Sequence, residues 1–205
     1  KRIMTYFIEA TEKLIRSEGL DGLSIRKIAG EAGYNSATIY NYFNDLEELT
    51  LFGSVCYLRE YVAKLEKELR PGMRAIDQYR TIYQSCFNHY AFRFPDIYHN
   101  MFFGKYSYKL GAVLHLYYHE LFPGELDNFS ERMKSMLVSG SMWERDHITI
   151  DKMVQEGDMD ADKADTTLSL VIAVHQNFIY EASLGGEHFD PEAHEQKFNQ
   201  LFEYL

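Results

Sequence analysis

Residues 24–49 read SIRKIAGEAGYNSATIYNYFNDLEEL, and this stretch decides the fold of the N-terminal part of the chain. After Ser24, whose hydroxyl can cap a first turn, apolar residues recur at positions 25, 28, 29 and 32, on one face of a helix. Gly33 follows the last apolar position, where a helix commonly ends in a left-handed conformation. Asn35 or Ser36 can then cap a second helix. The stretch therefore predicts two short helices joined by a tight turn.

The second predicted helix has an apolar side and a polar side. Ile39 and Phe43 are four residues apart, so they share a face that points at the first helix. The other side chains are small or polar and face outward: Ser36, Ala37, Thr38, Tyr40, Asn41 and Tyr42. This is the layout of a helix-turn-helix, in which hydroxyl and amide groups of the second helix contact base edges or phosphates in the major groove.

The flanking segments complete a small helical module. Apolar residues at positions 3, 7, 10 and 14 predict a first helix, which Gly19 ends. Leu20 and Leu23 are expected to fold the next loop over the core. Downstream, Asp45 can cap a long helix that runs to Leu69 and ends at the sequence Arg-Pro-Gly.

Residues 3 to 49 resemble the N-terminal domain of the TetR (tetracycline-repressor) family of bacterial transcription regulators. The matching segments are LSIRKIA at 23–29, AGYN at 32–35, ATIYNYF at 37–43 and EEL at 47–49. The resemblance implies a set of DNA contacts: to phosphates from Ser24 and Arg26, to bases from Ser36, Ala37, Thr38 and Asn41, and to the DNA backbone from Tyr40 and Tyr42.

Charge and one substitution depart from a typical DNA-binding domain. Residues 1–49 contain six basic and eight acidic side chains, and the whole chain has a net charge of −10. Positive charge for DNA is confined to Arg2, Arg26 and Lys27, which indicates a selective binder with modest electrostatic attraction. The family often has a phosphate-binding lysine near the start of the fourth helix, whereas this chain has Leu46 there.

The remainder of the chain is predicted to be all-α. We expect a DNA-binding domain at 1–49 and a ligand-binding and dimerisation domain at 50–205. Proline, glycine and apolar spacing predict helices at 75–92, 95–103, 106–121, 126–143 and 161–184, a short helix at 149–156, and a last helix from Pro191 onward. Strand signals are weak throughout.

Aromatic residues are dense between positions 79 and 143. A core built from so many tyrosines must provide partners for their hydroxyls, which a wet or ligand-filled cavity would do. We therefore expect a pocket for a flat or apolar small molecule with a few polar atoms, such as an aromatic metabolite or drug. The residues predicted to line it are Tyr83, Phe87, Phe102, Met136 and Trp143.

The last two predicted helices carry apolar stripes that suit an interface. The stripes predict a dimer contact formed by Leu168, Val171, Ile172, His175, Ile179, Phe198, Leu201 and Phe202. In the TetR family this pair of helices forms a four-helix interface with a second copy. The alternative is that the stripes pack only within one chain.

Together these features predict a ligand-responsive transcriptional regulator, most simply a repressor, that binds a palindromic double-stranded DNA operator as a homodimer. The alternative is a helical small-molecule or metal-binding protein whose N-terminal bundle does not read DNA; Leu46 and the acidic N-terminal domain favour it. A third hypothesis, an enzyme using His115 and His119, lacks a further ligand or a catalytic motif. We expect no cofactor, no resident metal and no membrane span, and two reduced, buried cysteines, Cys56 and Cys86, in a cytoplasmic protein.

Overall fold

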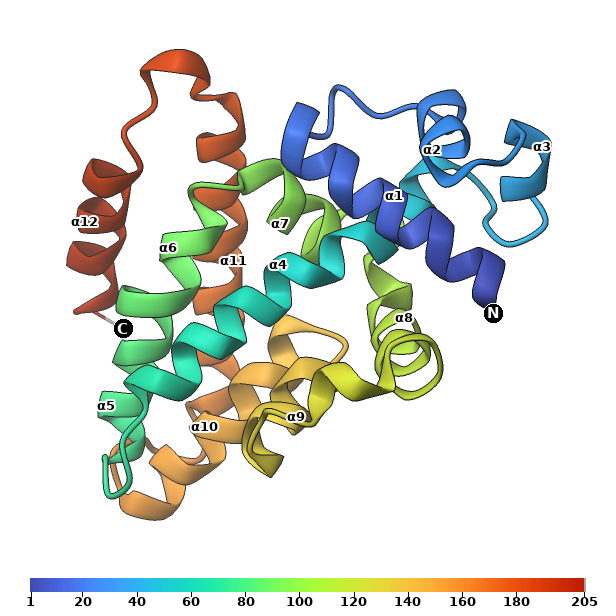
Figure 1. The fold of residues 1–205 in the computed structure, drawn as a ribbon. Helices are drawn as coiled ribbons and strands as arrows, with labels where there is room; N and C mark the ends of the chain where they lie inside the picture. The colour runs from blue at the N-terminus through green and yellow to red at the C-terminus, as the bar shows by residue number, and fades with distance from the viewer. Residues whose placement is uncertain (205) are drawn as a thin grey trace.

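The computed structural model describes residues 1–204, which contain helices and turns and no strand, so the all-α prediction is confirmed (Figure 1). The longer helices are α1 (Arg2–Glu18), α2 (Ile25–Ala32), α4 (Leu46–Glu68), α7 (Pro95–Phe103), α10 (Met142–Glu156), α11 (Ala164–Leu184) and α12 (Pro191–Phe202). The shorter ones are α3 (Ser36–Ile39), α5 (Ala75–Arg80), α6 (Asn88–Ala91), α8 (Leu110–Leu116) and α9 (Glu131–Val138). Two π-helical segments, η1 (Thr81–Phe87) and η3 (Tyr117–Leu121), and the 3-10 turns η2 (Ser107–Lys109), η4 (Pro123–Leu126) and η5 (Gly186–His188) complete the chain.

The helices α1, α2 and α3 gather at one end of the molecule, and α11 and α12 form the opposite edge (Figure 1). Between them runs α4, which begins beside α3 and continues through the body to α5. Most of its side chains are buried, including Leu49, Val55 and Leu65. One rigid helix therefore connects the N-terminal domain with the remainder of the protein.

The α1–α4 crossing is close because α4 has a glycine there. A Cβ built on Gly53 would lie 2.5 Å from Cγ2 of Thr11 on α1. Thr11 is fully buried, and its hydroxyl donates to the carbonyl of Phe7 at 2.7 Å. Any larger side chain at position 53 would push the two helices apart.

The body departs from the predicted helices in three places. The helix expected at 106–121 consists of the 3-10 turn η2, α8 and the π-helical segment η3. The helix expected at 75–92 contains the π-helical segment η1. The continuous helix expected at 126–143 is wrong: α9 ends at Val138 and α10 begins at Met142, and the separate helix expected at 149–156 is the second half of α10. The Ser141 hydroxyl accepts from the backbone of Glu144 at 3.1 Å, and the Glu144 carboxylate accepts from the backbone of Gly140 at 2.6 Å. This reciprocal cap starts a new helix.

The stripes predicted to form the dimer contact mostly face inward. Within residues 1–204, Leu168, Val171, His175, Ile179, Phe198 and Phe202 are buried, Ile172 is half-buried, and only Leu201 is exposed. The aromatic rings of Phe198 and Phe178 pack edge to face at 5.3 Å between α11 and α12. These six residues hold the two helices onto their own chain, so the dimer prediction is wrong for them. No helix of residues 1–204 is both long enough and apolar enough to cross a membrane.

Candidate nucleic-acid interface

The short helix α3 is positioned by the caps of α2 and by its own N-terminal cap. The Ser24 hydroxyl accepts from the backbone of Lys27 at 3.2 Å, which fixes the start of α2. Gly33 ends α2 with φ of +77°, a conformation that glycine adopts without strain. The Asn35 side chain then accepts from the backbone of Thr38 at 3.0 Å and starts α3. The predicted helix-turn-helix is therefore present, with Asn35 as the second cap.

The outward side of α3 is the side the sequence predicts. Ile39 and Phe43 are buried against the other helices, and the chain continues past Ile39 in a tight turn. Ala37 and Asn41 are exposed, and Ser36 and Thr38 are half-buried. Tyr40 is 58% exposed and Tyr42 37% exposed. Six side chains that can contact a groove thus lie on one accessible surface: Ser36, Ala37, Thr38, Tyr40, Asn41 and Tyr42.

Packing against α1 orients one of the two exposed tyrosines. The ring of Tyr42 lies 6.3 Å from that of Phe7, which is fully buried. Phe7 also packs edge to face with Tyr34, at 5.3 Å, directly after the α2–α3 turn. The Tyr42 ring is therefore supported by the core. On Thr38, by contrast, the hydroxyl already donates to Asn35 at 3.1 Å, so it is left to act as an acceptor.

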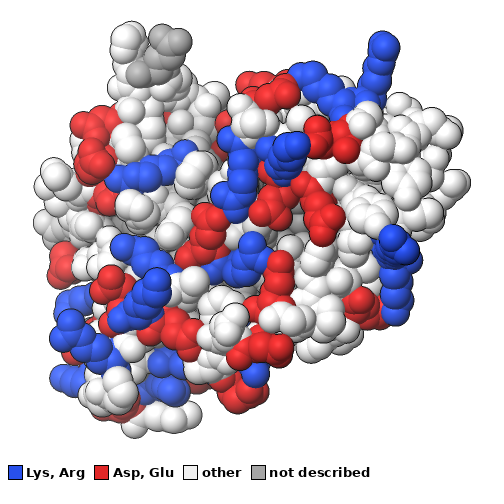
Figure 2. All heavy atoms as spheres, viewed as in Figure 1, with Lys and Arg blue, Asp and Glu red and all other residues white. Residues whose placement is uncertain are grey.

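The cations near α3 are largely neutralised within the protein. Lys27 donates to the Glu18 carboxylate at 2.5 Å and to the Gly22 carbonyl at 2.9 Å, so it holds a loop and is not free for DNA. Lys13 pairs with Glu31. Arg26 is exposed and has no ion-pair partner within residues 1–204. Figure 2 shows charges of both signs over the body and mostly uncharged atoms at the end that carries α3.

The sequence of this helix-turn-helix segment is similar to those of known regulators. Residues 7–51 match the family described as "Bacterial regulatory proteins, tetR family". An uncharacterized HTH-type transcriptional regulator of Haemophilus influenzae is 34% identical over 76 residues, which cover 37% of this chain and 41% of that protein. The N-terminal segment is therefore similar to the DNA-binding domain of the TetR family, and the chain matches less than half the length of this regulator.

The similarity to solved structures extends over the whole chain but is low in sequence. The fatty acid degradation regulator FadR from Bacillus halodurans has a TM-score of 0.54 and 16% identity, covering 97% of this chain and 93% of that one. A TetR family transcription regulator from Marinobacter aquaeolei has a TM-score of 0.45 and 16% identity, covering 96% and 92%. The first of these shows that the body has the same overall fold as a known regulator.

The start of α4 is held by cations from the body. Where the family often has lysine, Leu46 is half-buried. The neighbouring Asp45 carboxylate accepts from the Lys105 ammonium and the Tyr106 hydroxyl, both at 2.8 Å. Lys109 donates to Glu48 at 2.7 Å. We call Lys105, Tyr106 and Lys109 the α4 clamp.

The α4 clamp fixes the ionisation of the acids that it holds. Burial acts to raise the pKa of Asp45, but hydrogen bonds from Lys105, the backbone of Glu48 and Tyr106 outweigh it and lower the pKa to about 2. The pKa of Glu48 is lowered in the same way, by Lys109 and Asn44 against the effect of burial. Both carboxylates are charged at neutral pH. No sequence pattern indicates this contact, since the partners are 60 residues apart.

The residues predicted to line a ligand pocket do not surround one cavity. The ring of Phe87 packs against those of Tyr83 and Phe102, at 5.8 and 5.9 Å, in the core. Met136 is buried on α9. Trp143 is 37% exposed, and its ring packs at an angle of 59° against that of His147, away from Phe87.

The core tyrosines find a partner that the sequence analysis did not identify. The hydroxyls of Tyr79 and Tyr83 both donate to the buried carboxyl of Asp146, at 3.4 Å for Tyr79. Burial raises the pKa of Asp146 to about 7, against the effect of the two tyrosine hydrogen bonds. A dry core can therefore contain these hydroxyls without a ligand.

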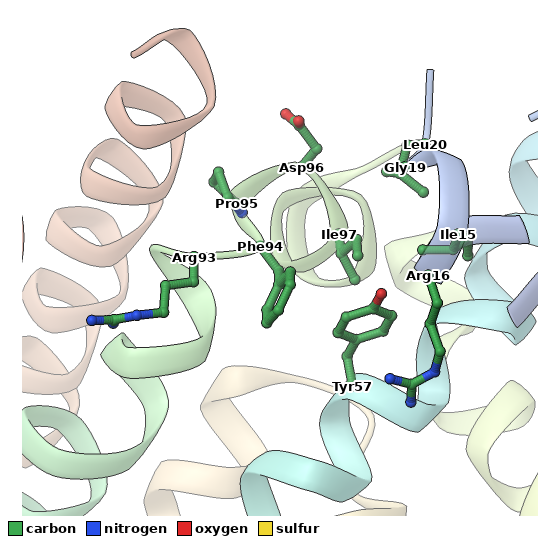
Figure 3. A pocket seen from close by; sticks show the side chains of 10 residues that line it. All are labelled: Ile15, Arg16, Gly19, Leu20, Tyr57, Arg93, Phe94, Pro95, Asp96 and Ile97. Atoms are coloured by element: carbon green, nitrogen blue, oxygen red, sulfur yellow. The ribbon is translucent and has the colours of Figure 1, made fainter. Parts of the chain in front are cut away.

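A hollow of about 280 Å³ separates the TetR-like domain from the body (Figure 3). Its aromatic floor consists of Tyr57 from α4 and Phe94 from the start of α7, with ring centroids 4.9 Å apart. Arg93 points away from it and pairs with Glu192 and Glu195 near α12. The Arg93 guanidinium therefore offers no free charge to a ligand in the hollow.

The histidine and cysteine hypotheses gain no support. The rings of His115 and His119 lie 4.5 Å apart, but no group of three or more metal-ligating side chains exists among residues 1–204. Cys56 and Cys86 are buried free thiols, as expected, and burial raises the pKa of each to about 12. Both thiols are protonated at neutral pH, which disfavours a redox-switch role.

Proposed function

We propose that this protein is a DNA-binding transcriptional regulator that reads an operator with the exposed surface of α3. The observation that carries the proposal is the combination of a capped helix-turn-helix with an accessible outer side at Ser36–Tyr42. Relatives matched over this domain are regulators, not enzymes. Direct contacts to base edges need small side chains and hydrogen-bonding groups at this position, and the chain has both.

The electrostatics support a binder that depends on sequence more than on charge. Of the six cations in the TetR-like domain, Lys1, Lys13, Arg16 and Lys27 are paired with carboxylates, whereas Arg2 and Arg26 have no carboxylate partner among residues 1–204. Few phosphate charges can then be neutralised, so affinity should fall only weakly with salt. Specificity must come from the polar groups of α3.

A homodimer is part of the proposal, with a contact that differs from the predicted one. On α11 the exposed residues Leu170, Ala173, Asn177, Tyr180 and Leu184 are spaced three and four residues apart. Such spacing forms a continuous seam that suits a second helix. A two-fold pair would present two α3 helices to half-sites of a palindromic operator.

Regulation by a small molecule completes the proposed function. The FadR relative is described as a regulator of fatty acid degradation, and TetR-like bodies suit the same role of sensing a metabolite here. If the effector and the operator favour different spacings of the two TetR-like domains, binding of the effector weakens binding of the operator. Binding of the operator then weakens binding of the effector by the same factor. Release from the operator makes the protein a repressor.

The test is operator binding by variants of α3. We expect Asn41→Ala and Tyr42→Phe each to weaken binding to the chain's own promoter DNA by about tenfold, since each loses one or two hydrogen bonds. Fluorescence anisotropy measures the affinity, and circular dichroism checks that the helices are retained. Ser17→Ala, on α1 away from α3, is the matched control.

Unchanged affinity in both variants would remove α3 from the interface. Failure of the parent protein to distinguish promoter DNA from a shuffled duplex would instead favour the alternative, a helical ligand-binding protein that does not read DNA.

A further inference from the structure

Arg145 carries a charge in the core of the body without a carboxylate partner. Its side chain is 4% exposed and forms no ion pair within residues 1–204. The Nη2 atom donates to the carbonyls of Leu137 and Ser139, at 3.2 and 2.9 Å, whereas Nε and Nη1 have no acceptor. Burial lowers the pKa of Arg145, yet a guanidinium keeps its proton in proteins. An uncompensated positive charge is therefore buried, which is costly.

The adjacent Asp146 does not neutralise Arg145. Its carboxyl faces Tyr79 and Tyr83, which donate to it, and no ion pair links it to Arg145 among the described residues. Burial raises the pKa of Asp146, which opposes its ionisation, and the charge of Arg145 acts in the opposite direction. No carboxylate oxygen among residues 1–204 is hydrogen-bonded to the guanidinium.

Other polar groups near Arg145 also lack partners. Thr149 lies four residues further along α10, on the same inward face, and its fully buried hydroxyl has no hydrogen bond. The hydroxyl of Tyr118, in the π-helical segment η3, is buried without a partner and within electrostatic range of Arg145. All three side chains can donate a hydrogen bond. What is missing is an acceptor with more than one oxygen.

A surface groove of about 350 Å³ shares one lining residue, Phe102, with the surroundings of this charge. It lies between the end of α7, the start of α8 and the α9–α10 turn, and its lining includes Phe102, Tyr108, Gly111, Gly140 and Glu144. The Phe102 ring centre lies 5.7 Å from the Arg145 guanidinium. A single aromatic side chain therefore separates the groove from the buried charge.

We propose that the groove and Arg145 form the effector site, and that it binds a small organic carboxylate. The carboxylate pairs with Arg145 and accepts from Tyr118 or Thr149, and the apolar part of the molecule takes the place of the Phe102 ring in the groove. Arg59, the other cation within electrostatic range of Tyr118, is paired with Glu125. One unpaired guanidinium therefore suits a single negative charge, and the apolar surroundings would leave a phosphate dianion underneutralised. The word effector rests on the proposed function; the carboxylate site does not.

The groove also lies next to residues that contact the start of α4, so ligand binding there can affect the position of α3. Its lining includes Ser107 and Tyr108, which lie between Lys105 and Lys109 of the α4 clamp. A ligand that displaces this turn would change the contacts of the clamp with Asp45 and Glu48 at the start of α4. Carboxylate binding would then alter how α4 holds the TetR-like domain.

The experiment uses the full chain and two matched pairs of probes: benzoate with benzamide, and octanoate with octanamide. We expect millimolar carboxylate, but not the neutral amide, to raise the thermal midpoint by several degrees. Arg145→Met should lose this shift, and Tyr118→Phe, which removes an unpartnered hydroxyl, should weaken binding several-fold. Arg132→Met is the matched control because Arg132 is another partly buried guanidinium with unpartnered nitrogens, on α9.

Each outcome decides the proposal. Equal shifts with acid and amide, no shift with any probe, or a full shift in Arg145→Met and Tyr118→Phe would overturn it. If Arg145→Met does not fold, Tyr118→Phe and the acid–amide comparison in the parent still decide. Operator binding is measured separately, without probe. A carboxylate site on a protein that does not bind its promoter would refute the proposed function and keep this inference.

Discussion

His175 shows at the scale of one residue how the core depends on pH. The ring is fully buried between Tyr83 and Phe198, with centroids 4.3 and 4.2 Å away. Its Nδ1 lies 3.0 Å from the Val171 carbonyl and its Nε2 3.0 Å from the Asn88 amide. Burial lowers the pKa of His175 to about 3, against the effect of the Val171 carbonyl. The imidazole is therefore neutral in the folded protein.

The neutral imidazole predicts a loss of stability in acid. The unfolded histidine takes up a proton near pH 6.5, whereas the folded one does not. The contribution of His175 to the free energy of unfolding is therefore constant above that pH and falls below it. The loss should reach about 3 kcal/mol at pH 4. In His175→Gln this component should be absent, as measured by urea unfolding at pH 4, 5, 6 and 7.

The comparison with the parent protein isolates His175. Asp146 acts with the opposite sign, since its raised pKa makes stability fall as pH rises from about 4 to 7, but it is common to both proteins. His119→Gln, at an exposed position, is the control and should follow the parent. An identical pH profile in His175→Gln and the parent would contradict the assignment.

Residue-scale prediction from sequence succeeded where the signal is local. The caps Ser24, Asn35 and Asp45 and the left-handed Gly33 follow from the residues within three positions of each. The contact of Lys105 with Asp45 joins two distant segments, and no periodicity marks it. Arg145 could not be distinguished by its sequence from a surface arginine.

At the scale of helices, glycines separate close packing from open surface. Gly53 of α4 faces Thr11 of α1, so Gly53→Ala should lower the free energy of unfolding by roughly 1–3 kcal/mol. Gly30, inside α2, has no atom within 4 Å of an added Cβ, so Gly30→Ala should raise it by about 0.5–1 kcal/mol. Chemical unfolding of the two variants beside the parent measures both changes. An increase in the free energy of unfolding for Gly53→Ala, as for Gly30→Ala, would show that the α1–α4 crossing is not tightly packed.

Helix prediction failed where a cap competed with a long apolar pattern. Positions 126–143 look continuous by hydrophobic spacing, yet Ser141 and Glu144 form a capping pair that starts α10. The spacing of serine and glutamate three residues apart is a sequence signal for a helix start, and it was outweighed by the apolar pattern. No such signal marks the π-helical segments, in which Tyr83, Phe87 and Tyr118 are buried.

At the scale of the whole molecule, the sequence predicted a dimer contact on a face of α11 that the chain buries itself. α11 has two apolar faces, and spacing alone cannot say which one the chain buries itself. The structure buries the Leu168–Ile179 face and leaves Leu170, Tyr180 and Leu184 exposed at 52%, 52% and 67%. Only the described fold, with α7 and α10 packed on the inner face, distinguishes them.

The exposed face predicts how the dimer can be broken. Leu170→Asp combined with Tyr180→Asp places four like charges in one two-fold seam, so the protein should become a monomer in light scattering at micromolar concentration. Its helicity should be unchanged, because neither side chain is buried in the chain's own core. Operator affinity should fall at least tenfold, since two linked half-site contacts become independent. Trp143→Asp, at an exposed aromatic residue outside the seam, should remain a dimer. A double variant that keeps the parent's mass and operator affinity would place the contact elsewhere.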